Sequence, residues 1–309
     1  MLYRQFGSTG WEFSAIGLGA WNISDQWGEM DVATAVGTVL SAIDNGVNMI
    51  DTADAYGTPH GLGEERLGKA LVGLRHKIYL ISKVGHWGIR SGFMVPKTTV
   101  DMIILCAHAS LYRLRTDYHD VLLCHEGSIE DPSVYLAGFD ELVRRGNLRK
   151  YGISTDKLDV LKRFNQNGTC SVVQIDYSLI NKSPEYNGML DYCAENGIGV
   201  MVRGPLAMGL LSGKYNRDSF FGDSVRAGWN QEGNAQREIF QEKMKKVEEL
   251  EKIIPPEKLA ETALRYLITH PIMPVPIPGA KSAMQAARNA AAGSELLDAE
   301  LYNKLREIR

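Results

Sequence analysis

The chain has 309 residues, of which 44% are hydrophobic and 23% are charged, the usual balance for a globular protein with a large core. Its 34 basic and 37 acidic residues give a formal net charge of −3, so no basic excess is available to bind nucleic acid or an anionic membrane. A chain of this length forms either two average domains or one large α/β barrel.

No segment has the pattern of a targeting signal or a membrane span. Residues 1–5 contain no apolar run, and nowhere do eighteen apolar residues follow one another. The four cysteines are widely spaced, without a CxxC pair or a histidine at metal-ligand spacing. We therefore expect reduced thiols, no metal site, and a cytoplasmic location with neither a membrane nor a nucleic acid as partner.

Eight short apolar segments, rich in β-branched residues, alternate with longer segments of helical periodicity. Three of the helical segments have clear boundaries. The first, 31–42, begins at Asp31 as its N-cap, the second, 132–146, follows Asp131, and the third, 256–269, carries one apolar stripe. The predicted strands are 14–19, 47–51, 78–83, 121–125, 151–154, 172–176, 198–203 and 273–277.

This alternation indicates parallel strands that are covered by helices on both faces. Eight such units with no Pro/Gly/Ser-rich linker between them predict an α/β fold, a single (β/α)₈ TIM barrel over 1–309, with a loop insertion around 215–235 after the seventh strand. The alternative is an open doubly wound sheet. The first strand is not followed by GxGxxG, the best nucleotide-binding signal of that architecture.

Polar side chains end several of the predicted strands. Asp51, Lys83 and His125 end the second, third and fourth strands, and Tyr56 follows Asp51 by five residues. Because the carboxyl ends of barrel strands meet at one rim, we expect these four side chains to converge there. Further polar strand ends expected at the same rim are Ser154, Gln174 and Arg203.

A phenol, an ammonium, a carboxylate and an imidazole form an acid–base set that suits carbonyl reduction. Hydride delivered to a carbonyl carbon leaves an alkoxide, which Tyr56 would protonate. The ordinary pKa of a tyrosine is about 10, and we expect Lys83 to lower the pKa of Tyr56 by roughly 1–3 units. Asp51 would keep Lys83 charged, and His125 would hydrogen-bond the carbonyl oxygen. Each residue alone has an ordinary structural explanation, but four together favour a functional role.

A series of ordered motifs runs along nearly the whole chain. They are the hairpin pattern 3–10, Gly17-Leu18-Gly19-Ala20-Trp21, Asp51-Thr52-Ala53-Asp54-Ala55-Tyr56-Gly57, 64–71, 110–118, Gly204-Pro205-Leu206, 209–214 and 277–282. Together they resemble the aldo-keto reductase superfamily. The resemblance implies a barrel with a short N-terminal β-hairpin. It also implies an NAD(P)H-dependent oxidoreductase that reduces an aldehyde, ketone or sugar, with Tyr56 as general acid supported by Asp51, Lys83 and His125.

The resemblance also implies an extended nicotinamide cofactor across the rim. Ser154 and Gln174 match positions that hold the nicotinamide amide, and Lys281 and Ser282 match positions near the ribose 2′ group. A cation there can pair with a 2′-phosphate, so NADPH is favoured and NADH is the alternative. The cofactor contacts implied in this way are Gly19, Ala20, Trp21, Ser154, Gln174, Arg203, Pro205, Leu206, Gly209, Leu211, Lys214, Gly279, Lys281, Ser282, Gln285, Arg288 and Asn289.

Three positions depart from the family pattern. Thr155 stands where asparagine is frequent, Arg203 stands where an aromatic residue often stacks on the nicotinamide, and Arg288 replaces a commonly acidic neighbour of the adenine. A guanidinium can also stack on a ring, but it brings a charge. These departures leave the preference between NADPH and NADH open.

Aromatic residues commonly line substrate pockets. Trp21 is the best placed for that role, and Trp87 and Trp229 are weaker candidates. His86 and His108 receive no role from the sequence, and Met208 is expected to be a packing residue.

Two other functions remain open. Lys83 could form a Schiff base, as in an aldolase, although Tyr56 and the segments around Lys214 and Lys281 would then have no explanation. The chain could also be a cofactor-binding regulatory subunit, as parts of this superfamily are, although its four catalytic residues are intact. The identity of the small carbonyl substrate, the reaction direction and the oligomeric state do not follow from the sequence.

Overall fold

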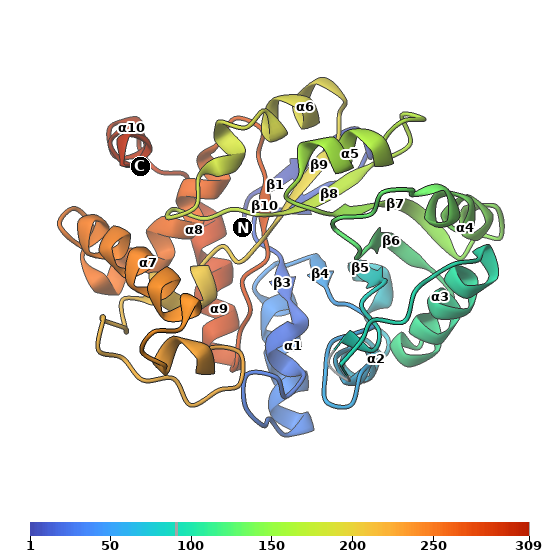
Figure 1. Ribbon diagram of the computed structural model, residues 1–309, viewed down its shortest axis with the longest axis horizontal. Helices are drawn as coiled ribbons and strands as arrows, with labels where there is room; N and C mark the ends of the chain where they lie inside the picture. The colour runs from blue at the N-terminus through green and yellow to red at the C-terminus, as the bar shows by residue number, and fades with distance from the viewer. Residues whose placement is uncertain (90–91, 309) are drawn as a thin grey trace.

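The computed structural model describes residues 1–89 and 92–308 and contains an eight-stranded parallel barrel surrounded by helices (Figure 1). Each strand pairs with the next one in the chain, and Gly17 and Gly19 donate backbone N–H groups to the carbonyls of Pro276 (2.9 Å) and Pro278 (3.2 Å), which joins the last strand to the first. The predicted barrel is confirmed, and the open sheet is wrong. The strands are β3 (Leu18–Gly19), β4 (Met49–Asp51), β5 (Tyr79–Val84), β6 (His119–Cys124), β7 (Leu148–Ser154), β8 (Val172–Asp176), β9 (Gly199–Arg203) and β10 (Val275–Pro276).

The helices begin close to where their capping residues predict. Asp31 accepts a hydrogen bond from the backbone N–H of Thr34 (2.8 Å), and Asp131 accepts one from Ser133 (2.9 Å). The third predicted helix, 256–269, starts with a 3₁₀ turn over Pro256–Lys258 before the α-helix begins at Leu259. The helices are α1 (Val32–Asp44), α2 (Leu62–Ala70), α3 (Val100–Leu114), α4 (Ser133–Arg144), α5 (Leu158–Phe164), α6 (Met189–Glu195), α7 (Ala235–Glu251), α8 (Leu259–Thr269), α9 (Ala283–Ala291) and α10 (Ala299–Glu307). None of these helices is long and apolar enough to cross a membrane, a finding that covers the described residues only.

A short antiparallel hairpin closes one end of the barrel. It is formed by β1 (Tyr3–Gln5) and β2 (Glu12–Ser14), and the rings of Phe6 and Phe13 stack on each other with centroids 4.3 Å apart. Both rings are buried with the apolar side chains of the barrel interior, and Ser8 donates its N–H to the carbonyl of Gly197, next to the start of β9. The hairpin therefore covers the amino ends of the strands and leaves their carboxyl ends open.

The inserted loop after β9 is packed against α7. Phe221 and Trp229 contact the ring of Phe240 on α7, with centroids 5.4 and 5.2 Å apart. Trp229 is only 5% exposed, so it is a packing residue and the idea that it lines the substrate pocket is wrong. Asn234 caps α7 by accepting a hydrogen bond from Gln236 (2.9 Å).

Substitutions at two glycines test how closely the barrel strands β7 and β8 pack. A Cβ at Gly152 of β7 would lie 1.7 Å from the carbonyl oxygen of Val172 on β8, whereas a Cβ at Gly37 in α1 would meet open space. We expect Gly152→Ala to lower the free energy of unfolding by about 1–3 kcal/mol or more, because the backbones must separate. The control Gly37→Ala should raise it by about 0.5–1 kcal/mol, since alanine favours the helix. Urea unfolding measures both, and an unchanged midpoint for Gly152→Ala would contradict the close strand contact.

Candidate active site

The carboxyl ends of three strands bring Asp51, Lys83 and Gln174 together. The ammonium of Lys83, on β5, donates to both carboxylate oxygens of Asp51, on β4, at 2.8 and 2.7 Å. It also donates to the carbonyl of Thr52 (2.8 Å) and to the hydroxyl oxygen of Tyr56 (3.2 Å). Gln174, on β8, donates its amide to Asp51 (2.8 Å). Lys83 and Asp51 are 0% and 2% exposed, so this ion pair is shielded from solvent.

The surroundings of Lys83 keep it charged. Burial by itself lowers the pKa of a lysine, but the charges of Asp51 and Tyr56 and their hydrogen bonds together raise the pKa of Lys83 above its ordinary value. The ammonium therefore remains protonated around neutral pH and is a permanent hydrogen-bond donor to Tyr56.

The pKa of Tyr56 moves in the opposite direction to the sequence-based expectation. Burial raises the pKa of this phenol above its ordinary value, Lys83 lowers it, and the carboxylate of Asp51 raises it again. The expected net lowering by Lys83 is wrong, because burial and Asp51 together outweigh the ammonium. A neutral phenol is the form that can donate a proton, and since Lys83 donates to its oxygen, the hydroxyl proton is available to another acceptor.

Two rings contact the phenol of Tyr56, and a third ring stacks on one of them. The imidazole of His125, which follows β6, stands edge-on to it with centroids 6.1 Å apart, and the indole of Trp21 stacks near it at 6.0 Å. The imidazole of His86 stacks on that of His125, with centroids 3.9 Å apart and planes 18° apart. The structure thus brings the four predicted catalytic side chains together and adds His86, which the sequence analysis missed. The position of His86, three residues after the strand-end residue Lys83, could have indicated that it lies near the same rim.

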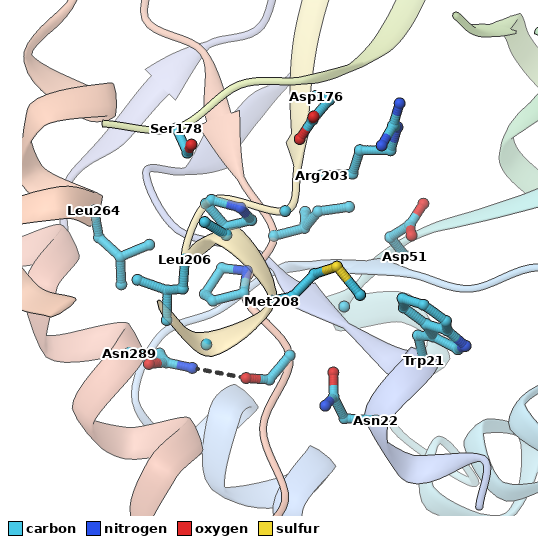
Figure 2. Close-up of a pocket in the computed structure, with 18 of the residues that line it drawn as sticks. Trp21, Asn22, Asp51, Asp176, Ser178, Arg203, Leu206, Met208, Leu264 and Asn289 are labelled. Carbon is cyan, nitrogen blue, oxygen red and sulfur yellow. Dashed lines mark hydrogen bonds between the residues drawn. The ribbon is translucent and has the colours of Figure 1, made fainter. Parts of the chain in front are cut away.

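A cavity of about 1590 Å³ opens above this group at the carboxyl ends of the strands. Figure 2 shows part of it, with Trp21 and Asp51 on one side and Leu206, Leu264 and Asn289 on the other. Asp51, Tyr56 and His125 line the cavity, and Lys83 lies directly beneath them. The expected cofactor contacts that line it are Gly19, Trp21, Ser154, Gln174, Arg203, Pro205, Leu206, Gly209, Lys214, Gly279, Lys281, Gln285, Arg288 and Asn289.

Three expected cofactor contacts do not line the cavity. The side chains of Ala20 and Leu211 are 0% exposed and belong to the hydrophobic core, and the Ser282 hydroxyl caps α9 by accepting a hydrogen bond from Gln285 (3.2 Å). A motif match indicates where a segment lies in the fold, but not which of its side chains point into the cavity. Trp87 is likewise outside the lining, with its ring against His60 (5.3 Å).

The loop after β9 turns sharply along one wall of the cavity. Its backbone is in the left-handed region at Gly204 (φ +62°), Met208 (φ +57°) and Gly209 (φ +94°). Such turns can direct backbone N–H groups toward an anion. Met208, expected to be a packing residue, lines the cavity (Figure 2).

Basic side chains also line the cavity. Lys281, at the start of α9, donates to the carbonyl of Trp27, and Asn289 on α9 donates to the carbonyl of Gly279 (3.2 Å; Figure 2). Arg226 of the inserted loop lies over the ring of Trp27 at 5.3 Å. Trp27 and Arg226 are not among the cofactor contacts expected from the sequence, because only folding brings the inserted loop to this wall. Cations in the lining here are Lys214, Arg226, Lys281 and Arg288.

Arg203 is tied to an acidic neighbour that the sequence analysis also missed. It ends β9 and forms an ion pair with Asp156, which follows β7. Asp156 also accepts a hydrogen bond from the backbone N–H of Asp176 (2.6 Å), at the end of β8. Both aspartates line the cavity (Asp176 in Figure 2), so the charge of Arg203 is partly neutralised within it.

The segment of the chain that forms the barrel matches a known family. The model of the Aldo/keto reductase family matches residues 15–309. The chain belongs to this family. Its barrel is therefore that of an aldo/keto reductase, a family of oxidoreductases.

Two curated relatives of this aldo/keto reductase differ in the function that their names give. The chain is 32% identical over 231 residues to the NADH-specific methylglyoxal reductase of Escherichia coli (strain K12), with 69% of each protein covered. It is 28% identical over 301 residues to a probable voltage-gated potassium channel subunit beta of Arabidopsis thaliana, covering 94% of this chain and 90% of the relative.

Two solved aldo/keto reductases share the fold over nearly their whole length. The holo form of aldo-keto reductase AKR11C1 from Bacillus halodurans has a TM-score of 0.82 and 28% identity, covering 100% of this chain and 96% of its own. An aldo/keto reductase from Klebsiella pneumoniae, solved in complex with NADP and acetate, has a TM-score of 0.71 and 28% identity, covering 98% and 93%.

Proposed function

We propose that the chain is an NADP-dependent oxidoreductase that reduces the carbonyl of a small aldehyde, ketone or sugar to an alcohol, with Tyr56 as the general acid. The observation that carries this proposal is the contact of the Lys83 ammonium with both Asp51 and Tyr56, beside His125 at the floor of the cavity. An acid, a charged partner and a second hydrogen-bonding group next to a large cavity are the groups that carbonyl reduction requires.

Each side chain has one task in this reaction. When bound, the nicotinamide cofactor supplies the hydride. Tyr56 donates its hydroxyl proton to the carbonyl oxygen, and Lys83 stabilises the phenolate that remains through their 3.2 Å hydrogen bond. Asp51 holds the ammonium in place, and His125 donates a hydrogen bond to the same carbonyl oxygen as negative charge develops on it.

The residues of the cavity fit a dinucleotide cofactor. Gln174 uses its Nε2 for Asp51, which leaves its Oε1 as an acceptor at the cavity, beside Ser154 on the neighbouring strand. The left-handed turns after β9 and the cations Lys214, Lys281 and Arg288 in the lining supply donors for phosphate groups, whereas Arg226 is paired with Asp223. A cavity of about 1590 Å³ has room for such an extended ligand and a small substrate.

The preference for NADPH rests on Lys281. We expect Lys281→Ala to weaken NADPH binding by about 10- to 100-fold, because a charge-assisted contact with the 2′-phosphate contributes roughly 1.5–3 kcal/mol, and to change NADH binding little. Fluorescence titration gives both dissociation constants, with Lys252→Ala, an exposed lysine of the α7 end paired with Glu249, as the matched control. An equal loss for both cofactors would contradict this role of Lys281.

The surroundings of Lys83 disfavour an aldolase-like reaction. A lysine must lose its proton before it attacks a carbonyl, yet the pKa of Lys83 is raised and its ammonium is 0% exposed. The oxygen atoms that accept hydrogen bonds from Lys83 all stabilise its protonated form. Borohydride should therefore trap no substrate on Lys83.

The regulatory function is the second candidate, since one relative is a probable channel subunit. Cofactor oxidation, followed with NADPH and NADH against a panel of aldehydes, ketones and aldoses, separates the two functions. We expect turnover with at least one carbonyl class and faster turnover with NADPH. Tight NADPH binding without turnover across the panel would favour a regulatory subunit instead.

A further inference from the structure

His86 and His125 form a stacked pair of imidazoles at the catalytic end of the cavity. Their ring centroids lie 3.9 Å apart, their planes differ by 18°, and both side chains line the cavity in half-buried positions. His125 presents its edge to Tyr56, at 6.1 Å and 75°. His86 is therefore one ring away from the group that donates the proton.

The fold delivers His86 to this position through a turn that requires glycine. β5 and β6 are neighbours in register, and His125 donates its backbone N–H to Val84 (2.8 Å), so the loops that leave these two strands begin side by side. Gly85 between Val84 and His86 has φ +146°, and a Cβ there would lie 3.0 Å from the hydroxyl of Tyr135. The path of the backbone thus places the two side chains next to each other.

Two imidazoles at this separation resist double protonation. Like charges within about 4–6 Å disfavour each other's charged form, so protons bind to the pair one at a time, with coupled titrations. The ordinary pKa of histidine is about 6.5, which places this coupling in the working range of most enzymes.

We propose that His86 is a positioning residue for His125: it holds the ring of His125 edge-on to Tyr56 by stacking, and it takes the first proton of the pair, so that repulsion keeps His125 neutral. The consequence for catalysis rests on the proposed function, in which His125 donates a hydrogen bond to the substrate carbonyl. A neutral His125 leaves Tyr56 as the sole proton donor and adds no second cation next to the ammonium of Lys83.

Among the described residues, other charged groups adjoin His125 in the chain or line the same cavity, and most have partners of their own. The pair of Lys83 and Asp51 lies behind Tyr56, and the Glu126 carboxylate accepts the hydroxyl of Tyr135. From the loop after β7, Asp156 pairs with Arg203, and Lys157 donates to Ser128 (3.1 Å). These groups are unchanged by a substitution at His86, so a comparison of variants isolates the effect of the second imidazole.

NMR titration of the histidine ring protons in the cofactor-free protein tests the pair directly. The variants are His86→Asn, which removes both ring and charge, and His86→Phe, which keeps a ring without a charge. We expect the pKa of His125 to rise by about one unit in both variants. The matched control His108→Asn removes an exposed histidine of α3 and should leave that pKa unchanged.

Activity measurements on the same two variants separate the effect of ring stacking from the effect of charge. The acid limb of the pH profile of kcat/KM should move upward by the same amount as the pKa of His125 in both variants. His86→Phe should retain more of kcat than His86→Asn, because only the former still supports the ring, while KM for the cofactor stays the same.

The NMR result stands whether or not the protein reduces carbonyls, so failure of the pair and failure of the proposed function are distinguishable. An unchanged pKa of His125 in both variants would overturn the proposal. If His86→Asn fails to fold in thermal unfolding, His86→Phe decides the question on its own.

Discussion

Tyr56→Phe is expected to lower kcat by about 10³-fold, within the range of 10² to 10⁴ that general acid catalysis supplies, and to leave the affinity for NADPH nearly unchanged. The substitution removes one hydroxyl and keeps the ring that contacts Trp21 and His125. Because the pKa of Tyr56 is raised by burial, the phenol is neutral at the pH of the assay, and the loss reflects the missing proton donor.

Steady-state kinetics and NADPH fluorescence titration measure the two quantities separately. Tyr112→Phe is the matched control, since Tyr112 lies on α3 with 86% of its surface exposed. If Tyr56→Phe retains the wild-type kcat, another group protonates the substrate and the role of Tyr56 is wrong.

Lys83→Met should reduce both activity and stability. It removes the cation beside Tyr56, and we expect kcat to fall by about 10²-fold or more, as for the loss of one preorganised electrostatic donor. It also leaves the buried carboxylate of Asp51 without its ion partner, which costs about 3–5 kcal/mol of unfolding free energy.

The double variant Lys83→Met/Asp51→Asn distinguishes the two effects. Removal of both charges takes away the uncompensated buried carboxylate, so stability should recover relative to Lys83→Met, while activity should not recover. Urea unfolding and initial rates give the double-mutant cycle. Additive losses of stability would show that the two side chains act independently, contrary to the hydrogen bonds of 2.7 and 2.8 Å between them.

The fold was predictable from the sequence because parallel strands buried on both faces are continuous apolar runs. All eight runs became strands, and Asp31 marked a helix start correctly. Strand lengths were less predictable: β3 and β10 contain two residues each, since the barrel closes there through the backbone of Gly17, Gly19 and the prolines opposite.

The candidate site was predictable where it depends on strand ends. Asp51, Lys83 and Gln174 meet because they end neighbouring or opposing strands of one rim. Side-chain direction within a loop was not predictable: Ala20 and Leu211 lie in segments that border the cavity, but their side chains are buried in the core. The stack of His86 on His125 depends on the turn at Gly85, which no local pattern reveals.

The direction of the pKa shift of Tyr56 was not predictable from the sequence. The sequence indicates that a lysine is near the phenol, but the net shift depends on how deeply the hydroxyl is buried and on the distance of Asp51 from the same ammonium. Both are properties of the folded protein. A sum of nearby charges therefore predicted the wrong sign.

Transfer of deuterium from NADPH labelled at C4 of the nicotinamide tests the central claim most directly. With each of the two labelled epimers in turn, mass spectrometry of the alcohol shows whether the label reaches the former carbonyl carbon. We expect one deuterium in the product from one epimer with the wild-type protein, and product formation reduced to trace levels with Tyr56→Phe. Alcohol formed without the label, or formed equally well by the Tyr56→Phe variant, would contradict this expectation.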